Sequence, residues 1–255
     1  MFFRTESFQQ FIRSYPIVTF LVGLHLFLWV MIDVLGLPFF WQLERIGVGS
    51  NQGIANGEYW RLVTPIFLHG GFTHALFNSF SLVLFGPALE QMLGRAKFIT
   101  AYLGAGVIAN LGTYVFGPDV YLHLGASGAI FGLFGIYLYM IYFRKDLIDQ
   151  ANAQVVLTIA VIGVIMTLAR SNINIYGHMF GLLGGAVLAP ILLQSARPYS
   201  PYRNAQPRRR LDDNEIGFDP NRWKNKKFSN KSFVPRLLWG ALVVLILLGL
   251  VSRLL

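Results

Sequence analysis

The 255-residue sequence contains no cysteine and few charged residues. The lack of cysteine excludes disulfides, thiol nucleophiles and cysteine-based metal sites, and it leaves the cellular compartment open. Only 13% of the residues are charged and 55% are hydrophobic, whereas a soluble domain has about 25% charged residues. A water-soluble globule of this size would lack the polar surface to cover itself. The composition therefore predicts an integral membrane protein.

Seven apolar segments are long enough to cross a bilayer, which takes about 20 mostly apolar residues. We expect spans at 16–35, 72–89, 98–116, 125–143, 153–169, 176–194 and 237–252. No small-x-small cleavage site follows the first one, so we expect a membrane anchor there and not a cleaved signal.

The predicted fold is all-α, a polytopic membrane helix bundle divided into three parts. A six-helix domain takes residues 1–194, a basic cytoplasmic linker takes 195–236, and an additional C-terminal transmembrane helix takes 237–255.

The net charge of +9 is unevenly distributed along the chain. With the N-terminus inside, 17 of the 21 Lys and Arg residues fall on the inner side and 4 on the outer side. Cytoplasmic loops carry such an excess, so we expect a cytoplasmic N-terminus and an outer C-terminus. Because topology accounts for the charge, the sequence predicts a lipid environment and no nucleic-acid partner. The lack of a targeting peptide favours a bacterial plasma membrane.

Polar side chains inside the predicted spans are candidate functional groups, because lipid makes them costly. His69, His74 and Asn78 accompany the start of the second span, and His74 and Asn78, four residues apart, share a helix face. Ser127 stands at the start of the fourth span and His178 near the start of the sixth. By the charge count all three spans start on the outer side. These groups can therefore lie at a similar depth.

Glycines surround both the serine and the histidine. They are Gly125, Gly128, Gly132 and Gly135 in the fourth span, and Gly177, Gly181, Gly184 and Gly185 in the sixth. Small residues let helix backbones approach closely, which a Ser–His hydrogen bond between two helices requires. Each residue alone also fits a structural role, the serine as a packing residue and the histidine as a hydrogen-bonded core residue.

Together these residues resemble the rhomboid family of intramembrane serine proteases. The matching pieces are Trp60-Arg61, the string His69…His74…Asn78, Gly86-x3-Glu90-x3-Gly94, Gly125-Ala126-Ser127-Gly128 and His178-x2-Gly181-x3-Gly185. They occur in family order, and the resemblance covers about residues 12–195. The last predicted span resembles the six-plus-one arrangement of many family members.

The resemblance implies a role for each matching residue. Ser127 would be the nucleophile and His178 its general base, in a dyad without a third carboxylate. His74, Asn78 and the Ser127 backbone N–H would form the oxyanion hole. His69 would lie near the water-access side of the site.

The remaining matching residues would line or support the site. Trp60 and Arg61 would shape the outer loop, and Glu90 would brace the inner end of the core. The glycines that would allow close packing around the site are Gly125, Gly128, Gly181 and Gly185. At one position the sequence departs from part of the family: Phe131 stands where a tyrosine is often seen. Phenylalanine can pack on the His178 ring but cannot hydrogen-bond.

The implied activity is serine-type endopeptidase cleavage of transmembrane segments in membrane-protein substrates, with no cofactor and no metal. A zinc protease is disfavoured because the His-Glu-x-x-His motif is absent. An aspartyl protease needs paired aspartates within spans, and only Asp33 and Asp119 come near, at span edges. A transporter or channel would show buried charges or broken helices along a pathway, and this sequence shows neither. The remaining alternative is a proteolytically inactive rhomboid-like protein that binds membrane helices. Such relatives typically lack the Ser or the His, and this sequence has both.

Overall fold

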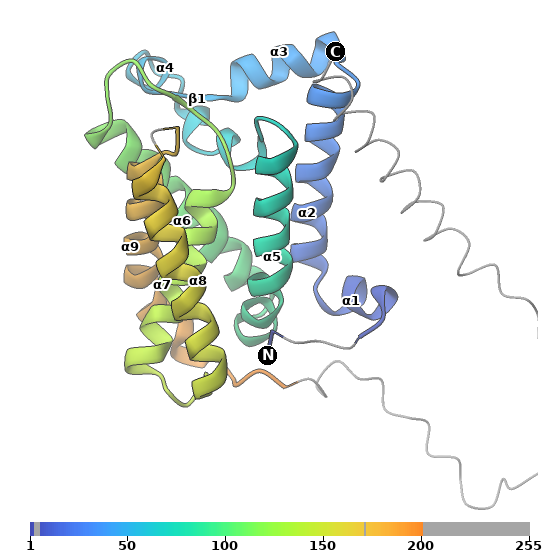
Figure 1. Ribbon diagram of the computed structural model, residues 1–255, viewed down its shortest axis with the longest axis vertical. Helices are drawn as coiled ribbons and strands as arrows, with labels where there is room; N and C mark the ends of the chain where they lie inside the picture. The colour runs from blue at the N-terminus through green and yellow to red at the C-terminus, as the bar shows by residue number, and fades with distance from the viewer. Residues whose placement is uncertain (3–5, 171, 201–255) are drawn as a thin grey trace, which may run out of the picture. The chain divides into compact units, whose positions relative to one another are not determined.

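The long helices of the described residues run roughly parallel or antiparallel to one another (Figure 1). The computed structural model describes residues 1–2, 6–170 and 172–200. Most of the predicted basic linker and the whole of the predicted span at 237–252 lie outside these residues.

Six helices correspond to the first six predicted spans. They are α2 (Pro16–Trp29), which continues as a π-helical turn to Val34, α5 (Phe72–Leu93), α6 (Arg95–Phe116), α7 (Ser127–Phe143), α8 (Gln150–Ala169) and α9 (Ile175–Leu192). All except α7 are long and apolar enough to cross a membrane. The prediction of an all-α polytopic membrane bundle is therefore confirmed for the described residues, and the chain is a multi-pass membrane protein.

The shorter elements flank these helices. They are α1 (Phe8–Ser14), α3 (Pro38–Gly47), α4 (Asn51–Ala55), the 3-10 turns Tyr59–Leu62, Thr64–Phe67 and Leu193–Ser195, and the strands β1 (Gly49–Ser50) and β2 (Leu122–His123). Helix α3 lies across the upper ends of α2 and α5 (Figure 1). Its exposed aromatic side chains, Phe39 and Trp41, suit the headgroup layer of a bilayer.

One short antiparallel pair was not anticipated by the all-α prediction. Gly49 of β1 pairs with His123 of β2, and Ser50 pairs with Leu122. The His123 ring occupies the space beside Gly49, where a Cβ atom would collide with it. Burial lowers the pKa of His123 to about 4, so the ring is neutral at pH 7. The pair joins the segment after α3 to the loop that leads into α7.

Helices α7 and α9 touch backbone to backbone. A Cβ atom at Gly181 would collide with the carbonyl oxygen of Gly128, and one at Gly185 with that of Gly132. At Gly135, the next turn of α7, a Cβ atom would collide with the carbonyl oxygen of Leu182. Glycine is therefore required along three successive turns of this crossing, because any side chain would separate the two helices.

This contact predicts a large difference between two glycine-to-alanine variants. Gly185→Ala should lower the free energy of unfolding by about 1–3 kcal/mol, the usual cost of overpacking a close contact. Gly23→Ala, in α2, should leave it unchanged or raise it by up to about 1 kcal/mol, because no atom lies within 4 Å of the added Cβ. Thermal unfolding of both variants in detergent checks this. Equal stability of the two variants would contradict the backbone contact.

Candidate active site

The first turns of α5 bring His74 and Asn78 to the loop that precedes α7. Helix α5 begins after Gly71, and the Nδ2 atom of Asn78 donates a hydrogen bond of 3.0 Å to the carbonyl oxygen of His74. A Cβ atom at Gly125 would collide with the His74 ring and lie 3.8 Å from Asn78 Nδ2. Both side chains therefore lie against the turn two residues before Ser127.

Ser127 is the first residue of α7, and two hydrogen bonds fix the turn before it. The Gly125 backbone N–H donates to the carbonyl oxygen of Pro65 at 2.9 Å. The Ala126 N–H donates to His69 Nε2 at 3.4 Å. Gly125 has a φ of +127°, a conformation that favours glycine. Because the first N–H groups of a helix have no partner within it, the start of α7 presents backbone donors beside the Ser127 side chain.

His178 lies in the first turn of α9, and its side chain is 8% exposed. Its ring stacks on Phe131 of α7, with 4.2 Å between ring centroids and 17° between planes. Phe131 is one helical turn beyond Ser127. The stacking is the contact that the sequence predicts for Phe131. On the ring edge, Nδ1 lies 2.7 Å from Thr167 Oγ1 on α8.

The glycine contact sets the serine and the histidine at the same level of the bundle. A Cβ atom at Gly128 would lie 3.3 Å from the carbonyl oxygen of Gly177. These two glycines are the sequence neighbours of Ser127 and His178. The structure thus brings the chain neighbours of Ser127 and His178 together, and His74 and Asn78 lie against the turn before Ser127.

His69 is buried beside two other histidines. Its side chain is 1% exposed, and its ring lies 4.7 Å from that of His25 and 5.2 Å from that of His74, centroid to centroid. Burial, with His25 and His74 beside it, lowers the pKa of His69 to about 2, so the ring is neutral and Nε2 can accept a hydrogen bond. His69 is thus packed inside and holds Ala126, and its place on the water-access side of the site stays a prediction.

Sequence reasoning missed two residues near the site. His25 of α2 is buried between His69 and Tyr102, whose hydroxyl lies 3.4 Å from His25 Nε2. A single histidine in an apolar span was the signal that could have found it. Thr167 carried no comparable signal, because a threonine in a membrane helix usually bonds to its own backbone.

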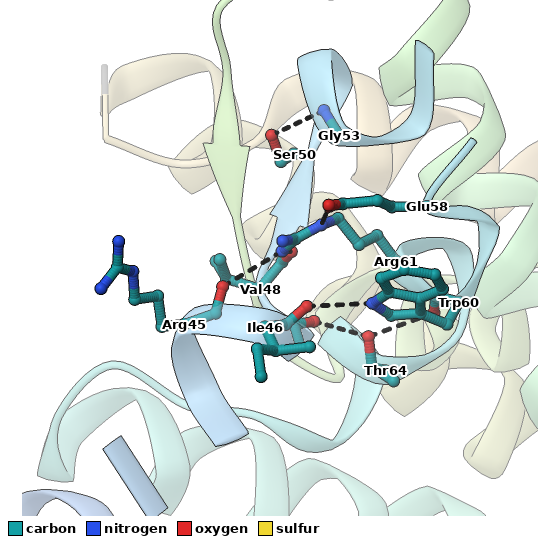
Figure 2. Close-up of polar contacts among 10 residues, drawn as sticks. Arg45, Ile46, Val48, Ser50, Gly53, Glu58, Trp60, Arg61 and Thr64 are labelled. Atoms are coloured by element: carbon teal, nitrogen blue, oxygen red, sulfur yellow. Dashed lines mark hydrogen bonds and ion pairs between the residues drawn. The ribbon is translucent and has the colours of Figure 1, made fainter. Parts of the chain in front are cut away.

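Trp60 and Arg61 hold the C-terminal end of α3 (Figure 2). Arg61 Nη1 donates to the carbonyl oxygens of Val48 at 2.6 Å and Arg45 at 3.2 Å, and Nε pairs with Glu58. Trp60 Nε1 donates to the carbonyl oxygen of Ile46 at 3.1 Å. Together these bonds fix the last turn of α3 and its C-cap, Val48.

Glu90 lies far along α5 from His74 and meets the start of α2. Its two carboxylate oxygens accept the backbone N–H groups of Ile17 at 3.0 Å and Val18 at 2.9 Å. These belong to the first turn of α2, whose N–H groups have no partner within the helix. Glu90 thus caps α2 from a neighbouring helix.

Within the described ranges, no group of three or more His, Asp or Glu side chains is arranged to hold a metal ion. The candidate site offers a hydroxyl, imidazole rings, an amide and backbone N–H groups.

Comparison with known proteins places the chain in a family. The model of the rhomboid domain matches residues 56–195. The sequence is 51% identical over 194 residues to the rhomboid-family protein YdcA of Bacillus subtilis, covering 76% of this chain and 97% of that protein. It is 39% identical over 150 residues to rhomboid protease GluP of the same bacterium, covering 59% of this chain and 29% of that protein. RHOMBOID-like protein 7 of Arabidopsis thaliana is 29% identical over 153 residues, which cover 59% of this chain and 49% of that protein.

The chain therefore belongs to the rhomboid family, as the motifs predicted. Relatives from this family carry the name of rhomboid proteases, which supports protease activity in the membrane for this chain.

Removing the Arg61 side chain should loosen the last turn of α3. Arg61→Ala loses two bonds to carbonyl oxygens and the pair with Glu58. Charge-assisted bonds contribute about 1.5–3 kcal/mol each. Since local opening exposes a peptide bond to protease, trypsin should cut after Arg45 about tenfold faster. Mass spectrometry of the fragments measures the rate. Arg13→Ala, on exposed α1, is the control, and an unchanged rate in Arg61→Ala would refute the proposed tether.

Proposed function

We propose that this protein is an intramembrane serine endopeptidase that cleaves transmembrane segments of membrane-protein substrates with a Ser127–His178 dyad. The observation that supports it most is the backbone contact between α7 and α9. Gly128 and Gly177 meet there, with Ser127 and His178 as their neighbours. The stacking of His178 on Phe131, one turn beyond Ser127, supports the same pairing.

The chemistry follows from the two side chains. His178 takes the proton of the Ser127 hydroxyl as Oγ attacks the scissile carbonyl carbon. The proton then passes to the leaving amine as the C–N bond breaks, which leaves an acyl-enzyme. A water molecule, deprotonated by His178, hydrolyses the ester and restores the hydroxyl of Ser127.

Hydrogen-bond donors around the turn before α7 would stabilise the negative charge on the oxygen of the tetrahedral intermediate. His74, Asn78 and the Ser127 backbone N–H would form the oxyanion hole. The amide nitrogen of Asn78 carries two hydrogens, of which the bond to the His74 carbonyl uses one. One oxyanion donor is typically worth about 2.7–4 kcal/mol of transition-state stabilisation. The positive end of the α7 dipole favours the same charge.

The length of α7 bears on where cleavage occurs. Its 17 residues span about 26 Å, less than the ~30 Å hydrocarbon core. Ser127 at its start would then lie below the bilayer surface, on the outer side by the distribution of basic residues. A helical substrate hides its carbonyl groups in backbone hydrogen bonds. Segments with Gly, Pro or other weak helix formers should therefore be cut in preference.

Substitution of either dyad residue should abolish cleavage of a model transmembrane substrate. Because the two residues act as a unit, Ser127→Ala and His178→Ala should each lower kcat/KM by at least about 10³-fold, with unchanged membrane insertion. Gel-based cleavage of the substrate in liposomes measures this. Ser81→Ala changes a serine on α5 away from the site and should keep activity. Full activity in either dyad variant would refute the dyad.

A serine-directed fluorophosphonate separates this proposal from an inactive helix-binding rhomboid-like protein. An activated serine reacts with the probe, whereas an unactivated one does not. We expect peptide mapping to find the label on Ser127, and labelling to be lost in His178→Ala. Helix binding without any labelling would favour the inactive protein, and label on another residue would place the nucleophile elsewhere.

A further inference from the structure

We infer that Thr167 is a positioning residue for His178: its side-chain oxygen accepts the Nδ1 proton and so leaves Nε2 free to act as the base. This inference rests on the proposed Ser127–His178 function. It assigns the orienting role to a neutral hydroxyl on a third helix.

The hydrogen-bond lengths around Thr167 decide which atom is the donor. Thr167 is 3% exposed and lies in the last turn of α8. Its Oγ1 atom lies 2.7 Å from the carbonyl oxygen of Gly163 and 2.7 Å from His178 Nδ1. A hydroxyl has one hydrogen, and a carbonyl oxygen can only accept. Both bonds can form only if Thr167 donates to Gly163 and His178 Nδ1 donates to Thr167.

This arrangement fixes the tautomer of the histidine. A neutral imidazole carries its proton on one nitrogen, so a proton on Nδ1 leaves the lone pair on Nε2. Nε2 can then take the proton of the Ser127 hydroxyl. When the ring becomes an imidazolium, Nδ1–H still points at an oxygen that accepts it.

Two contacts from two helices hold the ring. Phe131 of α7 covers its face, 4.2 Å away between centroids, but has no hydrogen-bonding group. Thr167 of α8 holds its edge. A Cβ atom at Gly163 would lie 3.1 Å from Phe131 Cζ, so the small residue one turn before Thr167 lets α8 approach. The Thr167 hydroxyl therefore sets the rotation of the His178 ring in its own plane.

Two substitutions separate this role from simple packing. Thr167→Val keeps the shape and removes the acceptor, and Thr167→Ser restores it. We expect Thr167→Val to lower kcat about tenfold, because the His178 ring is no longer held in its orientation. KM should stay within about twofold, because the substrate contacts are unchanged. Thr167→Ser should recover kcat to within about threefold of the native protein. Thr19→Val is the matched control: its hydroxyl bonds only to the Tyr15 carbonyl oxygen, 2.8 Å away on α2.

The tautomer can also be read without any change at Thr167. Nitrogen-15 NMR of the native protein, labelled at histidine, distinguishes a protonated ring nitrogen from an unprotonated one. His178→Gln identifies the signals of His178 by their loss. We expect the neutral ring to carry its proton on Nδ1.

The outcomes distinguish the two proposals. Retained cleavage in Ser127→Ala or His178→Ala would overturn the proposed function itself. Loss of cleavage in those two, with native kcat in Thr167→Val, would overturn only the role of Thr167. Equal loss in Thr167→Val and Thr167→Ser, or a proton on Nε2 in the native protein, would overturn it as well. A low kcat in Thr167→Val with recovery in Thr167→Ser supports it.

Discussion

The site depends on one constraint, the absence of side chains between α7 and α9. Gly181 and Gly185 let the two backbones meet, because a Cβ atom at either would collide with a carbonyl oxygen of α7. Gly128 and Gly132, on the α7 side, also make room for Ala109 and Ala105 of α6. The hydroxyl of serine is short and the reach of histidine is limited, so a hydrogen bond between neighbouring helices needs this closeness. Larger residues at these positions would move the Ser127 hydroxyl away from the His178 ring, although neither side chain is itself changed.

Buried polar groups elsewhere support the same arrangement, because an unpaired one is costly inside a membrane protein. Glu90 accepts two N–H groups at the start of α2. Asn174 accepts the N–H of Gly177 at 2.9 Å and donates to Thr113 at 2.9 Å, which fixes the start of α9 just before His178. His69 holds Ala126. Each of these bonds lies at the start of a helix, α2, α9 or α7.

The sequence was sufficient to predict the six long helices of the described residues, and it also singled out four candidate site residues. Apolar length marks a span, and polar residues are so rare in spans that Ser127, His178, His74 and Asn78 stood out. Two features of local sequence helped: the i, i+4 spacing of His74 and Asn78, and the glycines beside Ser127 and His178.

Contacts between distant segments were not predictable in the same way. The partner of Glu90 is a pair of backbone groups 72 and 73 residues away, and backbone atoms leave no pattern in a sequence. Thr167 meets His178 only because α8 returns beside α9. The β1–β2 pair has two residues in each strand, too few for an alternating pattern. The buried position of His69 depends on His25 from α2, which sequence spacing does not relate to it. The predicted orientation of the termini stays a prediction.

An experimental structure of the protein after reaction with a fluorophosphonate tests the central claim most directly. We expect the phosphorus atom bonded to Ser127 Oγ, the phosphoryl oxygen facing His74 and Asn78, and His178 Nε2 within about 3.2 Å of Ser127 Oγ. Phosphorus on another residue, or a His178 ring beyond hydrogen-bond reach of Ser127 with α7 and α9 apart, would contradict the account.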